Sequence, residues 1–338
     1  MTQMKTVLSG IRATGTSHLG NYIGAIARFA RMSQDPRYRC LFFVADFHTL
    51  TTLKEAEQIK KHLPNMVLDY LAAGVDLSHS AIYVQSDVPQ VTELAWLLSC
   101  LTPVTHLEGL PTYKDKREKH PEDINAGLFN YPVLMAADIL GPRADLVPVG
   151  SDQKPHIELT QSLARRFNNL YGHYFPVPGV LPDMVLVPGL SPMDERGGFA
   201  KMGKSDGNTI NLGDTPEQTW DKIRVAPTDP QRVHRTDPGN PDHCCIFALH
   251  QYVSTPEQLA WSREGCMSAG IGCMDCKRVL ADNINHMLAE FRERRMQLAQ
   301  KPDVIRDVLV EGKRQAEVLF NETIEHVRER MGIRRWGS

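Results

Sequence analysis

A short apolar strand, a glycine-rich turn and a helix open the chain, and this succession constrains the fold more than any other feature. Residues 5–10 form the apolar run, residues 15–24 contain the turn, and apolar residues then recur at helical spacing from near Leu19. Such a turn presents backbone N–H groups and the positive end of a helix to a phosphate. His18 can donate to a phosphate oxygen, and Gly20 has no Cβ to hold a flat ring away. A turn without any ligand explains the same residues equally well.

The alternation of strands and helices continues through the first half of the chain. Apolar strands are predicted at residues 40–45, 81–85 and 146–150, with helices between and after them. This pattern predicts an α/β fold, a Rossmann-like doubly wound parallel sheet with helices on both faces. Ligands of such sheets bind at the carboxyl ends of the strands, where His18, residues 46–48 and residues 151–153 fall.

The pattern of apolar residues changes near Thr215, and beyond it amphipathic helices are predicted in place of strands. We therefore expect four parts: an α/β domain over residues 1–190, a glycine- and proline-rich signature loop over 191–214, a helical domain over 215–330, and a tail over 331–338.

Composition excludes several classes of protein. The net charge of −2 gives no global attraction to nucleic acid, and we expect no DNA partner. No apolar run reaches the roughly 20 residues that span a bilayer, and the first residues lack the apolar core of a signal peptide. The cysteines number seven, which argues against a disulfide framework and predicts a cytoplasmic protein.

A second motif, Lys201-Met202-Gly203-Lys204-Ser205, places two lysines on a flexible stretch between glycines. Together with His18-Leu19-Gly20-Asn21, it resembles the two signatures of class I aminoacyl-tRNA synthetases. Asn21 stands in the place of the second histidine of the first signature, and Gly203 in the place of a serine of the second.

Asp138 is a carboxylate in the otherwise apolar helical run 131–140. A helix cap or a surface position would explain it. Alternatively, it accepts a hydrogen bond from a buried donor, and the indole N–H of tryptophan is a donor without acceptor capacity. Residues 131–140 and 147–160 resemble the corresponding segments of bacterial-type tryptophanyl-tRNA synthetases, and the likeness extends over nearly the whole chain.

This resemblance implies roles for individual residues around tryptophan. Asp138 would bind the indole N–H between apolar walls, and polar side chains would surround the α-ammonium and carboxylate. The walls would be Leu8, Met135, Val147 and Val149, and the polar groups Tyr131, Gln153 and His48. Leu8 departs from the phenylalanine that is common at this position.

The resemblance also implies an ATP site, Mg²⁺, tRNA(Trp) as second substrate, a homodimer, and an anticodon-binding role for the C-terminal helical domain. The catalytic charges would come from His18, Asn21, Lys201, Lys204 and Lys114. The ATP-binding residues would be Arg12, Gly15, His18, Gly20, Asn21, Gly150, Asp152, Lys201, Met202, Lys204 and Ser205. Arg12 and Ala13 replace the usual glutamine and proline.

Five cysteines crowd into residues 244–276, and thiolates at this density in a reducing compartment indicate a metal. Scattered buried cysteines are the plain alternative. Zinc and an iron–sulfur cluster are both compatible with the spacing, and the segment 266–276 is expected to be a loop. A subset of tryptophanyl-tRNA synthetases is similar, which implies a [4Fe–4S] cluster on Cys244, Cys266, Cys273 and Cys276, with Cys245 possible in place of Cys244.

Two other functions remain compatible with these motifs. A tyrosyl-tRNA synthetase would share the signatures, although it needs a phenol-binding set of side chains rather than Asp138. A non-catalytic RNA-binding or redox-sensing relative could keep the cysteines, although the intact signatures argue against it. ATP–pyrophosphate exchange with tryptophan and with tyrosine separates the three.

Overall fold

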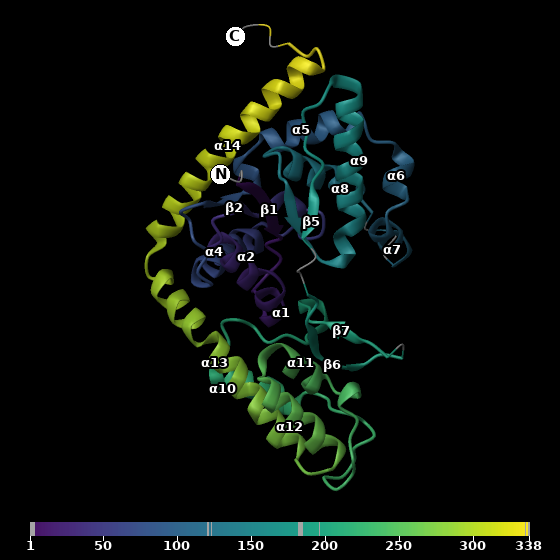
Figure 1. The fold of residues 1–338 in the computed structure, drawn as a ribbon, viewed down its shortest axis with the longest axis vertical. Helices are drawn as coiled ribbons and strands as arrows, with labels where there is room; N and C mark the ends of the chain where they lie inside the picture. Colours follow the sequence, from purple (N-terminus) through teal and green to yellow (C-terminus); the bar gives the residue numbers. More distant parts are fainter. Residues whose placement is uncertain are drawn as a thin grey trace.

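A five-stranded parallel sheet forms the centre of the α/β unit (Figure 1). The structure is a computed structural model, and it describes residues 4–119, 122, 124–181, 185–195, 197–334 and 336. The strand order is β3-β2-β1-β4-β5, and the order reverses direction beside β1, as the doubly wound prediction requires. The strands are β1 (Lys5–Ile11), β2 (Tyr38–Val44), β3 (Ser80–Val84), β4 (Leu146–Pro148) and β5 (Gly179–Leu181).

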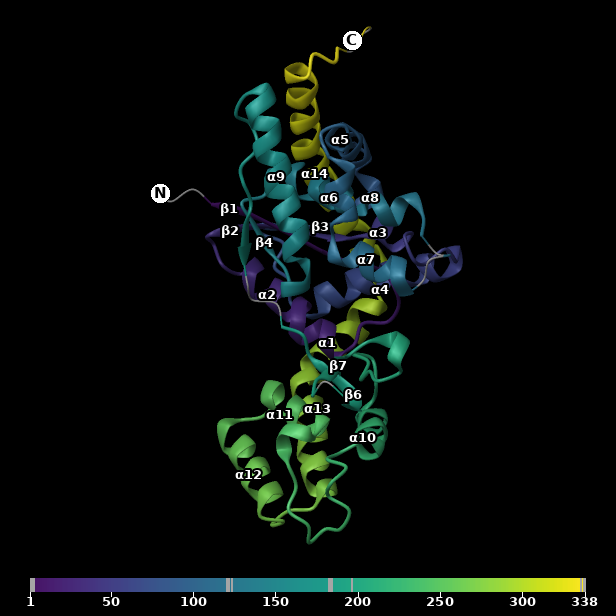
Figure 2. The same cartoon turned by 90° about the vertical axis from the view of Figure 1, so that its right-hand side faces the viewer.

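Helices cover both faces of this sheet and create two apolar cores, so the predicted fold class is confirmed. One core joins α2 and α4 to the sheet, and the other joins α5, α8 and α9 to it (Figures 1 and 2). The helices are α1 (Leu19–Asn21), a π-helical turn (Tyr22–Ile26), α2 (Ala27–Ser33), α3 (Asp46–Thr49), α4 (Ala56–Ala72), α5 (Gln90–Ser99), α6 (Val104–Glu108), α7 (Pro111–Lys119), α8 (Ala126–Leu140) and α9 (Lys154–Tyr171). Short 3₁₀ turns span Gln85–Asp87 and Ser151–Gln153.

The predicted signature loop contains an antiparallel hairpin of β6 (Pro188–Met193) and β7 (Phe199–Lys201) and a 3₁₀ turn (Lys204–Asp206). The helical unit follows it (Figure 1). Its elements are α10 (Pro216–Val225), a 3₁₀ turn (Pro241–His243), α11 (Cys245–Val253), α12 (Pro256–Met267) and α13 (Cys273–Ala299). Within the described part of the chain, every helix is too short or too polar to span a membrane.

The last helix, α14 (Pro302–Arg330), departs from the predicted division at residue 215, because it returns to the α/β unit (Figure 1). Gly312 lies against the backbone of Ile82 in the edge strand β3, so closely that a Cβ would collide with the Ile82 carbonyl. Near its end, the Thr323 hydroxyl donates to the Gly141 carbonyl over 2.5 Å. Amphipathic spacing identifies an apolar stripe but not its partner, so the sequence assigned α14 to the wrong neighbour.

Candidate active site

A cavity of about 460 Å³ opens at the carboxyl ends of β1 and β4. It is the position at which open parallel sheets bind their ligands. Most of the side chains predicted around tryptophan and ATP line it together. They are Leu8, Arg12, Gly20, Asn21, His48, Tyr131, Met135, Asp138, Val147, Val149, Gly150, Asp152 and Gln153.

Asp138 lines this cavity and is 1% exposed, which excludes a surface position. His48 Nε2, on α3, lies 2.9 Å from Asp138 Oδ2. The side-chain amide of Gln85 donates to both carboxylate oxygens, over 2.8 and 3.0 Å. Burial raises the pKa of Asp138, and the hydrogen bonds from His48 and Gln85 oppose that rise. His48 therefore contacts the buried carboxylate of Asp138, whereas the sequence assigned it to the α-ammonium and carboxylate of the amino acid.

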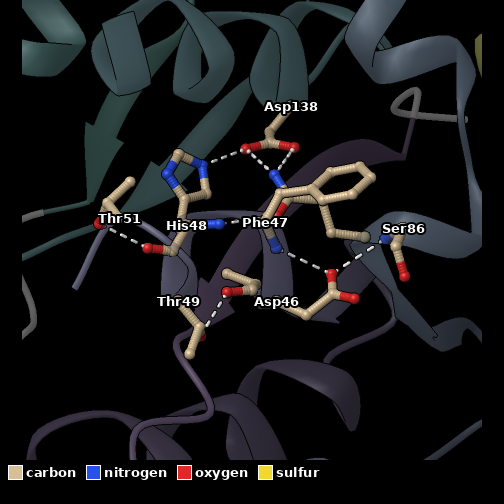
Figure 3. A network of polar contacts seen from close by, with 9 residues as sticks. Asp46, Phe47, His48, Thr49, Thr51, Ser86 and Asp138 are labelled. Atoms are coloured by element: carbon tan, nitrogen blue, oxygen red, sulfur yellow. Dashed lines mark hydrogen bonds and ion pairs between the residues drawn. The ribbon is translucent and has the colours of Figure 1, made fainter. Parts of the chain in front are cut away.

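The helix α3 and the 3₁₀ turn that carry His48 and Gln85 are joined through the Asp46 side chain. Asp46 Oδ1 accepts hydrogen bonds from the backbone N–H groups of Phe47 and Ser86, each over 3.0 Å (Figure 3). This carboxylate fixes α3 against the turn after β3, and so aligns both donors to Asp138. Gln85 was not predicted, although a glutamine directly after a buried strand was the available signal.

Tyr131 and His156 form a second polar pair at the cavity wall. The Tyr131 hydroxyl lies 2.6 Å from His156 Nε2, and His156 is fully buried in the first turn of α9. Burial raises the pKa of Tyr131 and lowers the pKa of His156, so both are neutral near pH 7. The sequence did not predict His156 as a site residue either, because its neighbours in sequence give no sign that it contacts Tyr131.

The two signature segments meet in space. His18 caps α1: its Nδ1 accepts from the Asn21 N–H over 3.3 Å, while Asn21 Oδ1 accepts from the His18 N–H over 3.1 Å. The Gly20 N–H points to Met202 Sδ at 3.4 Å, and a Cβ added to Gly15, where φ is +132°, would lie 3.0 Å from Lys204 Nζ. Burial and the Lys204 charge lower the pKa of His18 to about 4, and burial lowers the pKa of Lys204 to about 8.

The other predicted lysines lie apart from this junction. Lys201, on β7, is exposed and lines a separate cavity of about 560 Å³ beside α11. Lys114 is exposed on α7 and does not line the main cavity, whereas Lys116 does. Both occur in one basic run, and the sequence alone does not say which face of α7 points inward. The side chain of Ser205 lies outside the described residues.

The cysteines gather where three helices of the helical unit meet. Cys266 lies in the last turn of α12, and Cys273 and Cys276 lie in the first turn of α13, so the loop predicted over residues 266–276 is shorter, and the three cysteines lie on helices. Burial, together with charge on Cys244, Cys266 and Cys273, raises the pKa of Cys276 to about 12. Among the described residues, no three Cys, His, Asp or Glu side chains lie close enough to hold one metal ion.

Comparison with known proteins adds the deciding observation. Residues 2–289 match the family model described as tRNA synthetases class I (W and Y). The tryptophan–tRNA ligase of Deinococcus radiodurans is 41% identical over 98% of this chain and 99% of its own length. The chain belongs to the tryptophan–tRNA ligases of class I. The ligase of Thermotoga maritima is likewise 41% identical, over 97% of this chain and 99% of its own.

Solved structures agree with this membership. Tryptophanyl-tRNA synthetase of Campylobacter jejuni, complexed with ADP and tryptophan, superposes with a TM-score of 0.82 and 31% identity, covering 97% of this chain and 99% of that one. A tyrosyl-tRNA synthetase of Archaeoglobus fulgidus reaches a TM-score of 0.66 at 20% identity, which shows the shared fold alone. The chain is therefore an enzyme, a tryptophan–tRNA ligase, as the sequence predicted.

Proposed function

We propose that the main cavity binds tryptophan with its indole between Leu8, Met135, Val147 and Val149 and its N–H donated to Asp138. The buried carboxylate is the observation that carries this assignment. A carboxylate offers about four acceptor positions. His48 and Gln85 account for three contacts, which leaves capacity for one indole N–H. Tyr131 and Gln153, which line the same cavity, would hold the α-ammonium and carboxylate.

The ATP would lie over the first signature. Gly20 and Asn21 line the cavity beside Gly150 and Asp152, and Arg12, an exposed side chain that lines the same cavity, adds a positive charge. His18 and Lys204 would face the phosphates, and Lys116 would approach them in the role predicted for Lys114. Met202 contributes through its contact with Gly20. Gly15 leaves room for Lys204, while Lys201 would join only through movement of the hairpin that carries it.

The chemistry then needs no nucleophilic side chain. A tryptophan carboxylate oxygen attacks the α-phosphorus of ATP, the bond to pyrophosphate breaks, and a ribose hydroxyl of tRNA(Trp) later attacks the resulting adenylate. Alignment and charge neutralisation supply the acceleration. Mg²⁺ would enter with the phosphates, because Mg²⁺ commonly binds through substrate phosphates and few protein ligands.

The test is ATP–pyrophosphate exchange with tryptophan and with tyrosine. Exchange that depends on tryptophan alone is expected, since the Asp138 carboxylate suits a donor-only ring. Equal exchange with tyrosine would refute the assignment of Asp138.

We also propose that Cys244, Cys266, Cys273 and Cys276 hold a [4Fe–4S] cluster. Mutual perturbation of their thiol pKa values supports a common centre. A [4Fe–4S] cluster takes four thiolate ligands, and the resemblance noted from the sequence favours it over zinc. The Cys245 thiol donates to the Pro227 carbonyl over 3.1 Å, which favours Cys244 as the first ligand.

Anaerobically purified protein should then be brown and contain about four irons and four sulfides per chain. Cys273→Ser should lose the colour. Cys100→Ser is the matched control, because Cys100 is an exposed free thiol at the C-terminal cap of α5, in the other unit. Colourless protein with one zinc would exclude the cluster.

A homodimer in the cytoplasm completes the proposal. Trp96 on α5, 70% exposed, and Val104 on α6, 59% exposed, are apolar side chains that a second copy would cover. All seven cysteines are free thiols, as a reducing compartment would keep them. Light scattering of wild type and Trp96→Arg tests the dimer.

A further inference from the structure

The sulfur of Cys276 lies between two buried polar side chains of neighbouring helices. Ser262 Oγ, on α12, is 3.1 Å from Cys276 Sγ, and His250 Nε2, on α11, is 3.4 Å from it. His250 is fully buried, and Ser262 is 1% exposed. The helices α11, α12 and α13, which carry the three side chains, lie together in the helical unit (Figures 1 and 2). Buried polar groups need hydrogen-bond partners, and the sulfur serves both of these.

Ser262 contacts the sulfur of another helix rather than a carbonyl of its own. The hydroxyls of Ser99 and Ser268 show the common alternative, because each donates over 2.7 Å to the carbonyl four residues earlier. Ser262 lies inside α12, and its hydroxyl meets the first turn of α13 instead. A thiolate that is bound to a metal carries no proton, so this hydroxyl would donate to it.

A chain of hydrogen bonds determines which nitrogen of His250 carries the proton. The Thr255 N–H donates to Gln258 Oε1 over 3.1 Å, so the N-terminal cap of α12 sets the orientation of that amide. Gln258 Oε1 also accepts from Asn283 Nδ2 over 2.7 Å, and the same nitrogen of Asn283 donates to Ser254 Oγ over 2.9 Å. The Ser254 hydroxyl keeps its own proton to donate to His250 Nδ1, 2.6 Å away.

His250 therefore presents an N–H to Cys276. Full burial favours the neutral imidazole, and a neutral ring that accepts at Nδ1 carries its proton on Nε2. His250 Nε2 lies 3.1 Å from the Cys276 carbonyl and 3.4 Å from its sulfur, so the two acceptors share this N–H. His250 and Ser262 are thus arranged as two donors to a sulfur that has lost its proton.

The surroundings of Cys266 suit an anionic sulfur as well. Arg232 Nη1 lies 4.0 Å from Cys266 Sγ, and the carbonyls of Arg235 and Ile271 hold Arg232 Nη2 over 2.8 and 2.7 Å. A Cβ on Gly239 would lie 2.7 Å from the same sulfur, so glycine leaves the space that the sulfur occupies. Donors at one cysteine and a cation at another fit a centre built from thiolates.

We propose that His250 and Ser262 are positioning residues for the iron–sulfur cluster, whose hydrogen bonds orient Cys276 Sγ and raise the reduction potential of the centre. This inference rests on the cluster proposed above. Hydrogen bonds to a ligand sulfur withdraw electron density from the iron and so stabilise its reduced form. Asn283 acts through His250, because the chain that it belongs to determines which ring nitrogen donates.

The experiment compares reduction potential and cluster retention in anaerobically purified variants. Ser262→Ala should fold as wild type does, because alanine suits a helix interior. It should lower the midpoint potential, measured by redox titration of the visible absorbance, and should lose iron to a chelator roughly tenfold faster. His250→Phe should have the same two effects. His250→Gln, whose amide nitrogen can take the place of Nε2, should recover part of the loss.

Asn283→Asp tests the chain of hydrogen bonds without touching the sulfur. A carboxylate accepts from the Ser254 hydroxyl, so Ser254 Oγ would become the acceptor for His250 Nδ1, and the ring proton would move away from Nε2. The potential should then fall as in His250→Phe, and the ¹⁵N chemical shifts of His250 should report the exchanged tautomer.

Two matched controls separate these effects from general changes to the helices. His286→Gln alters an exposed histidine of α13, and Ser268→Ala alters an exposed serine at the end of α12. Both should keep the wild-type potential and the wild-type rate of iron loss.

Unchanged potentials in Ser262→Ala, His250→Phe and Asn283→Asp, in protein that carries the cluster, would overturn this inference alone. A lower melting temperature without a shift in potential would likewise overturn it, because it would show a packing role only. Wild-type protein without iron would remove the proposed cluster, and this inference with it.

Discussion

Asp138→Asn keeps the shape of the side chain but exchanges one carboxylate oxygen for an amide, which donates where the site needs an acceptor. In the structure, His48 Nε2 and the Gln85 amide already contact the two oxygens. Asparagine offers a single acceptor atom, so His48, Gln85 and an indole N–H would compete for it. The indole is the group that loses its partner, because the other two are fixed by α3 and the turn after β3.

The size of the effect follows from the charge of the acceptor. A hydrogen bond to an ionised group contributes about 1.5–3 kcal/mol. At about 1.4 kcal/mol per factor of ten, kcat/KM for tryptophan should fall roughly 10- to 150-fold. The KM for ATP should remain near that of wild type, since the proposed contact of Asp138 is with the indole alone.

Exchange kinetics with tryptophan and with its benzothiophene analogue, which lacks the N–H, provide the assay. Wild type should prefer tryptophan by about the same factor that the variant loses, and Asp138→Asn should treat the two amino acids alike. Met135→Leu, at an apolar wall, is the control that should keep the preference. An undiminished preference for tryptophan in Asp138→Asn would refute the hydrogen bond.

Three further predictions concern activation, packing and protonation. Lys204→Ala should lower the activation rate with little change in tryptophan affinity, measured by fluorescence titration; an equal loss of affinity would contradict a role confined to the phosphates. Gly312→Ala should reduce the free energy of unfolding by about 1–3 kcal/mol because its Cβ meets the Ile82 carbonyl, whereas Gly213→Ala, with nothing within 4 Å, should be neutral in denaturant melts. The pKa of His18 falls to about 4 on folding, so its contribution to stability is complete above pH 6.5 and is lost as pH falls towards 4. His18→Gln should flatten this part of the pH–stability curve. An unchanged curve would show that His18 is not held in its uncharged form by folding.

The sequence predicted the sheet and most of the cavity because their signals are local. A strand followed by a glycine turn fixes where His18 and Gly20 lie, and an aspartate inside an apolar helix identified Asp138. Each is the consequence of residue type and spacing within one element. Helical periodicity alone places Asp138 on the same face as its apolar neighbours, so one sequence was enough to predict that it points inward.

What the sequence could not predict depends on contacts between elements. Gln85 and His156 contact Asp138 and Tyr131 of the cavity wall because other elements pack beside them, and their own neighbours in sequence carry no such signal. The choice between Lys114 and Lys116 depends on how α7 is rotated against the cavity. The cysteines of α12 and α13 were placed on a loop because the glycines between them mark a turn, and the turn proved shorter than the cysteine spacing.

The return of α14 to the edge of the sheet has a consequence for synthesis of the chain. β3 is the outermost strand, and the backbone that it leaves unpaired is covered at Ile82 by Gly312, more than two hundred residues later. An uncovered edge strand is a template for pairing with other chains. During translation, the sheet is therefore complete in its strands long before that edge is closed. We expect nascent chains that end before residue 302 to depend on chaperones. Aggregation should stop being favoured only when the last helix has left the ribosome and packed against β3.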